Sequence, residues 1–349
     1  MMNMQITPWG LTRDGKQAQK YILTNRNGME VTLSDFSASV IDICLPVGGK
    51  MRSVVLGYET MEEYYQPGPE FAGFVGRNGN RIANGQVVLD GVCWQLEKNN
   101  NGHNLHSGSN RSYFEFYQAT TGEDTDRAWV EFFRISPHLE QDLPGDLDQK
   151  IRYTLTEGND LIIDYRMVSD RTTVINPTNH TYFNLMGHDS GDILSHKLTV
   201  HSEAFLPTDD TLIPTGEERS VEGTPMDFRT PHTIGERIDE NYAPLRQGSG
   251  YDHNFCFPND GRFREMALLE SPDGAVKMTV SSDKCGMQLY TCNFLGEIKG
   301  KDGVVYGRRK ALCLETQCYP NACNTPAFAT TVYQAGEVFE SRTCYGFSF

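Results

Sequence analysis

The sequence is short of positive charge. Its 349 residues carry 31 lysines and arginines against 46 aspartates and glutamates, which gives a net charge of -15 and an isoelectric point near 5.0. Nucleic acids and anionic membranes both bind basic surfaces. The charge balance therefore predicts neither as a partner, and it also disfavours a phosphorylated substrate.

Long apolar runs and paired cysteine motifs are missing as well. The first residues, MMNMQITPWGLTRDGKQ, contain no apolar run of signal-peptide length, and no later stretch is long enough to cross a membrane. The nine cysteines are odd in number and form no C-x-x-C pair. We expect free thiols in the cytoplasm rather than a disulfide framework. Cys313, Cys318 and Cys323 match no familiar zinc template.

Nothing in the chain marks a boundary between domains. No segment rich in proline, glycine and serine, no run of like charges and no internal repeat interrupts it. The polar section 209–250 is long, but apolar residues such as Leu212, Met226 and Phe228 predict an ordered excursion. We expect one domain over residues 1–349, because all-β folds often reach this length as single units.

Helical periodicity is also scarce, whereas hairpin signals are frequent. Asp90-Gly91 separates Val87–Leu89 from Val92–Trp94, which is the pattern of a two-residue hairpin. Further strands are indicated at Tyr21–Thr24, Glu30–Leu33, Ile151–Leu155, Leu161–Met167, Met266–Leu269 and Val276–Val280. Only Glu59–Gln66 suggests a helix, of about two turns. The sequence predicts an all-β fold, a large antiparallel β-sandwich with few short helices.

The segment INPTNHTYFNL, residues 175–185, is unusually polar for such a fold. It places three asparagines, one histidine, two threonines and a tyrosine within eleven residues. An alternating core strand has little use for so many amide groups. Neutral donors and acceptors around an imidazole suit a pocket for an uncharged, hydroxyl-rich ligand. A hydrogen-bonded loop that caps a sheet edge is the structural alternative.

Other segments share this character. They are GRNGNRIANG (76–85), NNNGHNLHSG (99–108), YDHNF (251–255) and LETQCYPNACN (314–324), and QLYTCNF (288–294) precedes the last of them. With NPTNHTYFNL, these six ordered segments resemble the galactose mutarotase, or aldose 1-epimerase, family from about Tyr21 to the C-terminus. The resemblance implies a galactose-mutarotase-like supersandwich. It also implies a cofactor-independent isomerase that interconverts the α and β anomers of free aldohexoses such as galactose and glucose.

Glu315 and His180 are the two residues to which the resemblance assigns the chemistry. Glu315 follows the apolar run Ala311–Leu314, which is typical of a buried strand. Burial of a carboxylate there costs free energy unless the group is ion-paired or has a function. His180 has a reference pKa of about 6.5, near the pH at which a proton donor is most useful. Each has a structural alternative, an ion pair with an arginine for Glu315 and a satisfied core histidine for His180. The resemblance implies that Glu315 is the general base and His180 the general acid.

Five more residues match family positions that hold the sugar. They are Asn80, Arg81, His106, Asp252 and Gln288. The arginine fork can hold sugar oxygens without titrating, and a carboxylate can accept hydrogen bonds from two hydroxyls. A structural arginine and a turn-stabilising aspartate are the alternatives.

Three residues depart from the family pattern near these positions. Ser107 and Cys292 stand where the family has glycine, and Asn321 replaces an acid. Ser107 leaves the loop conformation open, since its hydroxyl can tighten the turn or enter the site. Cys292 changes the local packing, and Asn321 affects the geometry of the binding loop but not Glu315.

Three other functions stay open on the residues alone. A phosphosugar epimerase would need extra basic residues at the mouth of the site. A glycoside hydrolase could use Asp252 and Glu315 as its two carboxylates. A non-catalytic sugar-binding protein would have no use for Glu315 and His180 together.

His103 and His106 lie close in sequence, but no acidic ligand or metalloenzyme motif accompanies them, so we expect neither metal nor cofactor. The sequence does not indicate the preferred aldose or the oligomeric state.

Overall fold

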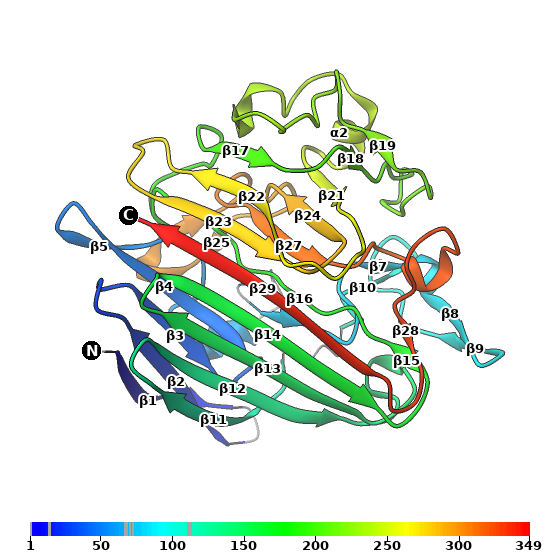
Figure 1. Cartoon of the computed structure of the whole chain (residues 1–349), viewed down its shortest axis with the longest axis horizontal. Coiled ribbons are helices and arrows are strands. Elements are labelled where there is room, and N and C mark those ends of the chain that lie inside the picture. Colours follow the sequence, from blue (N-terminus) through cyan, green and yellow to red (C-terminus); the bar gives the residue numbers. More distant parts are fainter. Residues whose placement is uncertain (1, 13–14, 66–68, 70, 72, 110–113) are drawn as a thin grey trace.

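The computed structural model describes residues 2–12, 15–65, 69, 71, 73–109 and 114–349. Its strands pair antiparallel in one nine-stranded sheet, two five-stranded sheets and five two-stranded ladders among these residues. The long strands β12, β13, β14 and β29 lie side by side across the molecule, as Figure 1 shows. The expected all-β sandwich is confirmed.

The nine-stranded sheet forms one layer. Its order is β11 (Gln118–Glu123), β12 (Arg127–Ser136), β13 (Leu147–Thr156), β14 (Asp160–Ser169), β29 (Val338–Ser348), β23 (Lys277–Ser282), β22 (Arg264–Glu270), β17 (Lys197–Val200) and β20 (His232–Thr233). The C-terminal strand β29 thus lies between β14 and β23, and it joins the strands β11–β14 to the strands β23, β22, β17 and β20, which come later in the chain.

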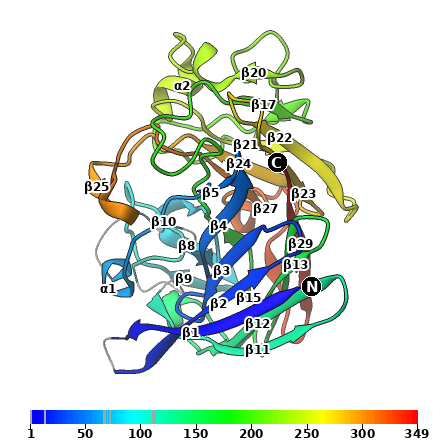
Figure 2. The same ribbon diagram turned by 90° about the vertical axis from the view of Figure 1, so that its left-hand side faces the viewer.

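The two five-stranded sheets pack against this layer. The first runs β1 (Asn3–Leu11), β2 (Gln17–Thr24), β3 (Glu30–Ser34), β4 (Ser39–Val47) and β5 (Lys50–Ser53), and it faces the viewer in Figure 2. The second runs β19 (Arg219–Ser220), β18 (Ala204–Phe205), β21 (Asp252–Cys256), β24 (Gly286–Tyr290) and β27 (Cys313–Gln317).

Short ladders and two short helices complete the described fold. The ladders pair β10 (Asn104–Leu105) with β7 (Arg81–Ile82), β16 (Thr178–Asn179) with β6 (Phe74–Val75), β15 (Thr173–Val174) with β28 (Val332–Tyr333), β8 (Gln86–Leu89) with β9 (Val92–Gln95), and β25 (Ile298–Lys299) with β26 (Val305–Tyr306). The helices are α1 (Met61–Tyr64) and α2 (Ala243–Gln247). Among the residues described, neither helix approaches the length and apolar character that a membrane span requires.

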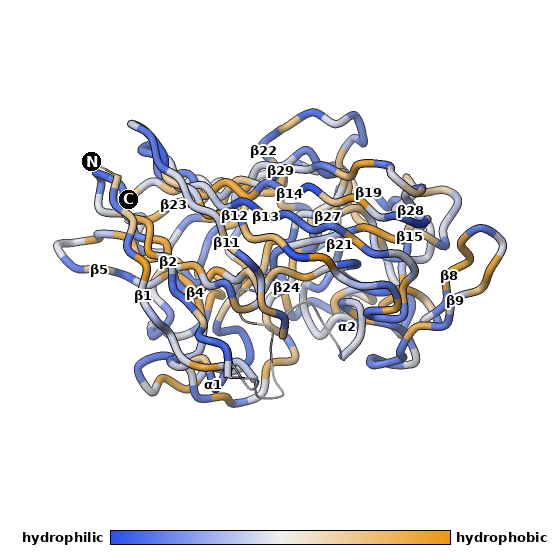
Figure 3. The backbone as a smooth tube through the Cα atoms, turned by 90° about the horizontal axis from the view of Figure 1, so that it is seen from below, coloured by the Kyte–Doolittle hydropathy of each residue, from blue (hydrophilic) through white to orange (hydrophobic). Residues whose placement is uncertain are grey.

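All three large sheets share one apolar core. Alternate residues of a strand face the same side, and the inward side chains of β13, such as Ile151 and Leu155, are fully buried. Apolar and polar residues follow one another along the strands in Figure 3. Two tyrosines cross between the layers, since Tyr153 Oη donates to Ala38 O at 2.7 Å and Tyr345 Oη donates to Leu314 O at 3.2 Å. The core therefore ties the site-bearing strand β27 to the large sheet.

Local turn chemistry explains both a confirmed element and a corrected one. Asp90 and Gly91 have φ of 50° and 77°, the left-handed pair that a two-residue hairpin turn requires, so the predicted β8–β9 hairpin forms. The helix predicted over Glu59–Gln66 is wrong in extent. A capping box of Thr60 and Glu63 starts the helix at Met61, and it ends after one turn at Tyr64. Gln66 lies outside the described residues.

The polar section 209–250 is ordered, as expected. Leu212, Met226 and Phe228 are buried, and α2 and β19 lie within it. Figure 1 shows this section above the sheet that contains β21 and β24.

Candidate active site

The site is built on the outer face of β21, β24 and β27. Residues opposite one another in antiparallel strands share a face, and the register pairs Gln288 with Glu315 and Asp252 with Tyr290. The alternate residues of these strands, including Met287, Leu289 and Leu314, belong to the apolar core. One face of the three strands therefore carries the core, and the other collects the polar side chains that the sequence analysis singled out.

Glu315 lies at the centre of this face with its side chain almost completely buried. Its Oε2 atom has no hydrogen-bond partner among the described residues. Burial raises the pKa of Glu315 well above the ordinary value, the negative charge of Asp252 adds to the shift, and Arg81 opposes it. A buried carboxylate with an unpaired oxygen and a raised pKa is suited to accept a proton near neutral pH. Among the described residues no arginine forms an ion pair with Glu315, which was the structural alternative; its nearest cationic partner is His180.

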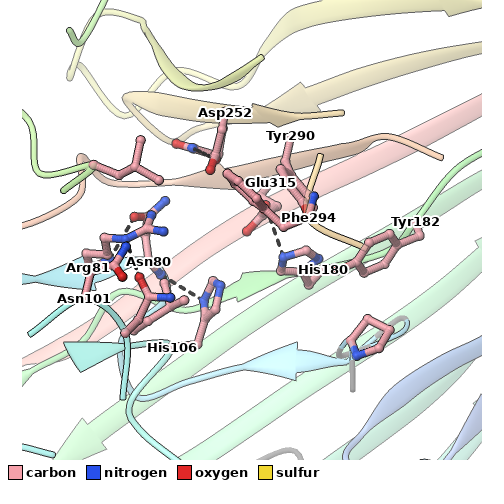
Figure 4. Close-up of a pocket in the computed structure, with 15 residues that line it drawn as sticks. Asn80, Arg81, Asn101, His106, His180, Tyr182, Asp252, Tyr290, Phe294 and Glu315 are labelled. Atoms are coloured by element: carbon pink, nitrogen blue, oxygen red, sulfur yellow. Dashed lines mark hydrogen bonds and ion pairs between the residues drawn. The ribbon is translucent and has the colours of Figure 1, made fainter. Parts of the chain in front are cut away.

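His180 faces Glu315 from a separate segment. It follows β16, which pairs with β6, and its backbone N–H donates to Gly73 O at 3.0 Å. The Nε2 atom lies 3.5 Å from Glu315 Oε1, as drawn in Figure 4. The ring of Tyr182 stacks on the imidazole with centroids 4.8 Å apart. A histidine and a carboxylate from two different segments of the fold thus face each other in the pocket.

His106 and Asn80 form a second corner of the pocket. The β7–β10 ladder brings their loops together, and Asn80 N–H donates to His106 Nδ1 at 3.1 Å. Burial lowers the pKa of His106 well below its ordinary value, and the nearby His180 and Arg81 add to the shift. His106 is therefore neutral at physiological pH. Because its Nδ1 accepts a bond, its proton resides on Nε2, which makes it a hydrogen-bond donor for a ligand oxygen.

Arg81 and Asp252 are two further charged side chains of the pocket. Arg81 Nε donates to Asn100 Oδ1 at 3.2 Å. Gln288 Nε2 donates to Asp252 Oδ1 at 2.6 Å. Burial raises the pKa of Asp252, while Arg81 and the Gln288 amide oppose the shift. Arg81 thus partly offsets the two buried carboxylates, and Asp252 keeps its second oxygen for a ligand.

These side chains line a cavity of about 280 Å³. That volume is near the lower end of the range of about 300–1,000 Å³ usual for small-molecule sites, so it suits a single sugar ring. All seven residues predicted for the site line this cavity: Asn80, Arg81, His106, His180, Asp252, Gln288 and Glu315. The structure thus brings together segments that are up to 235 residues apart in the chain, the separation of Asn80 from Glu315.

The cavity also has lining residues that the sequence analysis missed. Pro69, Asn100, Asn101, Leu105, Tyr182, Leu212, Tyr290 and Phe294 complete it. Tyr182, Tyr290 and Phe294 lie inside motifs already noted, so their aromatic rings were a usable signal. Leu212 could not be recognised from the sequence as a site residue, because it lies outside these motifs and reaches the cavity from the polar section 209–250.

The departures from the family pattern have distinct consequences. Ser107 tightens its turn, since its Oγ accepts from Asn78 N–H at 2.8 Å and donates to Asn78 O at 3.0 Å. Asn321 ties the binding loop down, because its N–H donates to Arg81 O at 2.9 Å and its Oδ1 accepts from Ala83 N–H at 3.0 Å. Cys292 adopts a φ of 54° and is buried in a second apolar cluster beside the site.

Two histidines and a carboxylate of this site could in principle bind a metal ion. Potential ligand atoms of His106, His180 and Glu315 lie within 4.8 Å of one another. His106 nevertheless has Nδ1 engaged by a backbone N–H and its proton on Nε2, so in this arrangement neither nitrogen offers a free lone pair. The geometry favours binding of hydroxyl groups.

The chain is similar to known proteins in both sequence and structure. The aldose 1-epimerase family model matches residues 19–346. The galactose mutarotase of Bos taurus is 39% identical over 301 residues, 86% of this chain and 85% of that protein. The aldose 1-epimerase of Haemophilus influenzae is 34% identical over 321 residues, 90% of each chain. The structure of an aldose epimerase homologue from C. elegans superposes with a TM-score of 0.84 at 26% identity and 99% coverage of both chains. The chain belongs to the aldose 1-epimerase family.

Proposed function

We propose that this protein is an aldose 1-epimerase that interconverts the α and β anomers of free aldohexoses such as galactose and glucose. The observation that carries the proposal is the buried pair of Glu315 and His180, 3.5 Å apart at their nearest atoms, in a cavity of sugar size. The names of the relatives, galactose mutarotase and aldose 1-epimerase, support the same reaction.

Mutarotation needs a base, an acid and room for one bond to rotate. Glu315 takes the proton from the anomeric hydroxyl while His180, as imidazolium, protonates the ring oxygen. The ring opens to an aldehyde, which rotates about the bond to the next carbon and closes through its other face. On closure, Glu315 returns its proton to the new anomeric oxygen, and His180 takes back the proton that it gave to the ring oxygen of the sugar. Each positioned acid–base group typically contributes about 10²- to 10⁴-fold.

The raised pKa of Glu315 is useful in this cycle. Ring opening moves one proton, through the sugar, from His180 to Glu315. A carboxylate with the ordinary pKa of glutamate is a weaker base than an imidazole, so it would make this transfer unfavourable. Burial and the charge of Asp252 make protonated Glu315 more stable, so that the two arrangements of the proton come closer in free energy. The reaction can then run in either direction.

The other polar residues hold the sugar while its ring is open. His106 offers a neutral N–H donor, Arg81 a fixed guanidinium, and Asp252 an acceptor braced by Gln288. Asn80 positions His106 through its backbone N–H. No covalent intermediate is needed, and residues of this chain supply every proton movement.

The reaction can be tested directly by polarimetry with freshly dissolved anomers of galactose, glucose and xylose. Accelerated optical relaxation is expected, with the relative rates giving the preferred aldose. Release of free sugar from a nitrophenyl galactoside without accelerated relaxation would instead indicate a hydrolase that uses Asp252 and Glu315. Saturable sugar binding without acceleration would indicate a binding protein.

We further propose that residues 1–349 act as one domain and that the protein works in the cytoplasm. The core shared by all three large sheets supports the first proposal. The nine free cysteines support a reducing compartment. A free monosaccharide is the proposed ligand, and the acidic charge balance favours neither nucleic acid nor an anionic membrane.

A further inference from the structure

Cys313 lies directly behind the proposed acid. It begins β27 two residues before Glu315, so the two side chains share one face of the strand. Its Sγ atom is 3.4 Å from His180 Nδ1, whereas His180 Nε2 is the nitrogen near Glu315 Oε1. Cys313 is completely buried and is not among the cavity-lining residues. It therefore contacts the histidine without lining the cavity.

The two ring nitrogens of His180 have different tasks in the proposed reaction. Before ring opening, His180 is an imidazolium with a proton on each nitrogen. After Nε2 has given its proton to the ring oxygen, His180 is neutral and its remaining proton is on Nδ1. The Nδ1 proton is thus retained in both states, and it needs an acceptor that is present throughout.

We propose that Cys313 is a positioning residue whose sulfur accepts the Nδ1–H of His180 and keeps the proton on that nitrogen through the catalytic cycle. The proposal rests on the proposed function, in which His180 is the acid. Tyr182 stacks on the imidazole and restricts its tilt. The Cys313 contact restricts rotation of the ring in its plane, so that Nε2 stays directed toward Glu315.

A thiol suits this position better than a charged partner. Burial raises the pKa of the Cys313 thiol well above its ordinary value, and the charges of Glu315 and Asp252 contribute, so the group stays neutral. A neutral sulfur is a weak acceptor that orients the ring without strongly stabilising the imidazolium. A carboxylate at the same place would hold the proton on His180 and weaken it as an acid.

The test combines nitrogen NMR with kinetics on three variants. Cys313→Ala removes the acceptor, Cys313→Ser replaces it with a hydroxyl oxygen, and Cys292→Ala removes a second buried thiol of the same apolar cluster as a control. Side-chain ¹⁵N shifts of His180 in ligand-free protein report which nitrogen carries the proton. Turnover and KM for galactose come from polarimetry.

At a pH high enough to make His180 neutral in ligand-free protein, we expect the wild-type ring to carry its proton on Nδ1, and Cys313→Ala to shift that population toward Nε2–H. Turnover of Cys313→Ala should fall by about 3- to 10-fold with KM little changed, as expected for loss of one weak hydrogen bond to a catalytic group. Cys313→Ser should restore both the tautomer and most of the turnover. Cys292→Ala should leave the His180 shifts unchanged.

The outcomes separate this proposal from the proposed function. Absence of mutarotation by the wild type would refute the function, whereas the nitrogen shifts report on the Cys313 contact with or without turnover. Unchanged His180 shifts in Cys313→Ala, or a wild-type proton already on Nε2, would overturn the role of Cys313. Equal kinetic losses in Cys313→Ala and Cys292→Ala would also overturn it, because they would indicate a packing effect.

Discussion

His106 accepts a hydrogen bond at Nδ1 from the backbone N–H of Asn80, with the two nitrogens 3.1 Å apart. This contact, together with the lowered pKa of His106, makes the residue a neutral donor. The other histidine of the site, His180, faces the buried carboxylate of Glu315 instead. The two imidazoles are neighbours, with ring centroids 5.3 Å apart, but they have different partners, and we propose different tasks for them on that ground.

This division of labour predicts different kinetic effects. His180→Asn should reduce turnover by about 10²- to 10⁴-fold, the range for one acid–base group. His106→Asn should cost less in turnover and more in KM, because uniform binding mainly affects KM. Polarimetry at varied galactose concentrations measures both, with folding checked by circular dichroism. A larger loss of turnover in His106→Asn would mean that the acid has been assigned to the wrong histidine.

The pH dependence of the reaction should show the influence of Asp252 on Glu315. The carboxylate must be ionised in the free enzyme, so kcat/KM should fall as the pH drops through the raised pKa of Glu315. That limb should lie well above the reference value of about 4.3 for glutamate. Asp252→Asn removes a negative charge that raises this pKa, so the acidic limb should move to lower pH.

Asp252→Asn should also raise KM, because it changes a proposed sugar ligand. The position of the limb in kcat/KM can be read separately from this loss of affinity. A limb that stays in place, or moves to higher pH, would contradict the electrostatic coupling of the two carboxylates.

Burial of Glu315 should cost stability at neutral pH. Between the unfolded pKa of glutamate and its raised folded pKa, the folded state binds one more proton than the unfolded state. Wild-type stability should then fall with rising pH by up to about 1.4 kcal/mol per pH unit from this group. Glu315→Gln removes this term, so the variant should gain stability relative to the wild type as the pH rises.

Chemical denaturation at several pH values measures this difference. Its pH dependence isolates the ionisation of Glu315 from any constant effect of the amide on packing. A stability difference that does not change between pH 4 and pH 8, an interval of about four units, would show that the carboxylate is not destabilised by burial.

The two hydrogen bonds of the Ser107 hydroxyl give a prediction about the loop beside His106. The hydroxyl of Ser107 accepts from the backbone N–H of Asn78 and donates to its carbonyl oxygen, and the φ of Ser107 is 65°. Ser107→Ala should reduce the free energy of unfolding by about 1–3 kcal/mol, since buried backbone groups lose partners. Ser107→Gly loses the same bonds but adopts this φ without strain, so it should lose less. Denaturation curves in which the glycine variant is less stable than the alanine variant would refute this account.

Much of the site could be predicted because its chemistry is concentrated in short polar motifs. Glu315 was recognisable as a carboxylate beside a buried apolar run and Gln288 as part of a family motif, and the register places the two opposite each other. His180 stood out among amide side chains that a core strand does not require. Hairpin turns such as Asp90-Gly91 predicted the fold class, since their backbone conformation depends on few residues.

What the sequence did not predict depends on tertiary placement. Leu212 reaches the cavity from a polar excursion whose path over the sheet has no local signature. The role of Ser107 was left open, because only the folded loop shows that its hydroxyl bonds Asn78 and does not line the cavity. The contact between Cys313 and His180 likewise joins residues 133 positions apart.

The central claim is that Glu315 removes the anomeric proton. The measurement that tests it most directly is polarimetry of fresh α-galactose with the Glu315→Gln variant, alongside galactose binding by calorimetry on the same sample. The amide keeps the shape of the side chain and an acceptor for the sugar, but it cannot take up the proton. The account predicts that galactose still binds while turnover falls by at least about 10²-fold. Near-normal turnover by a folded Glu315→Gln protein would contradict it.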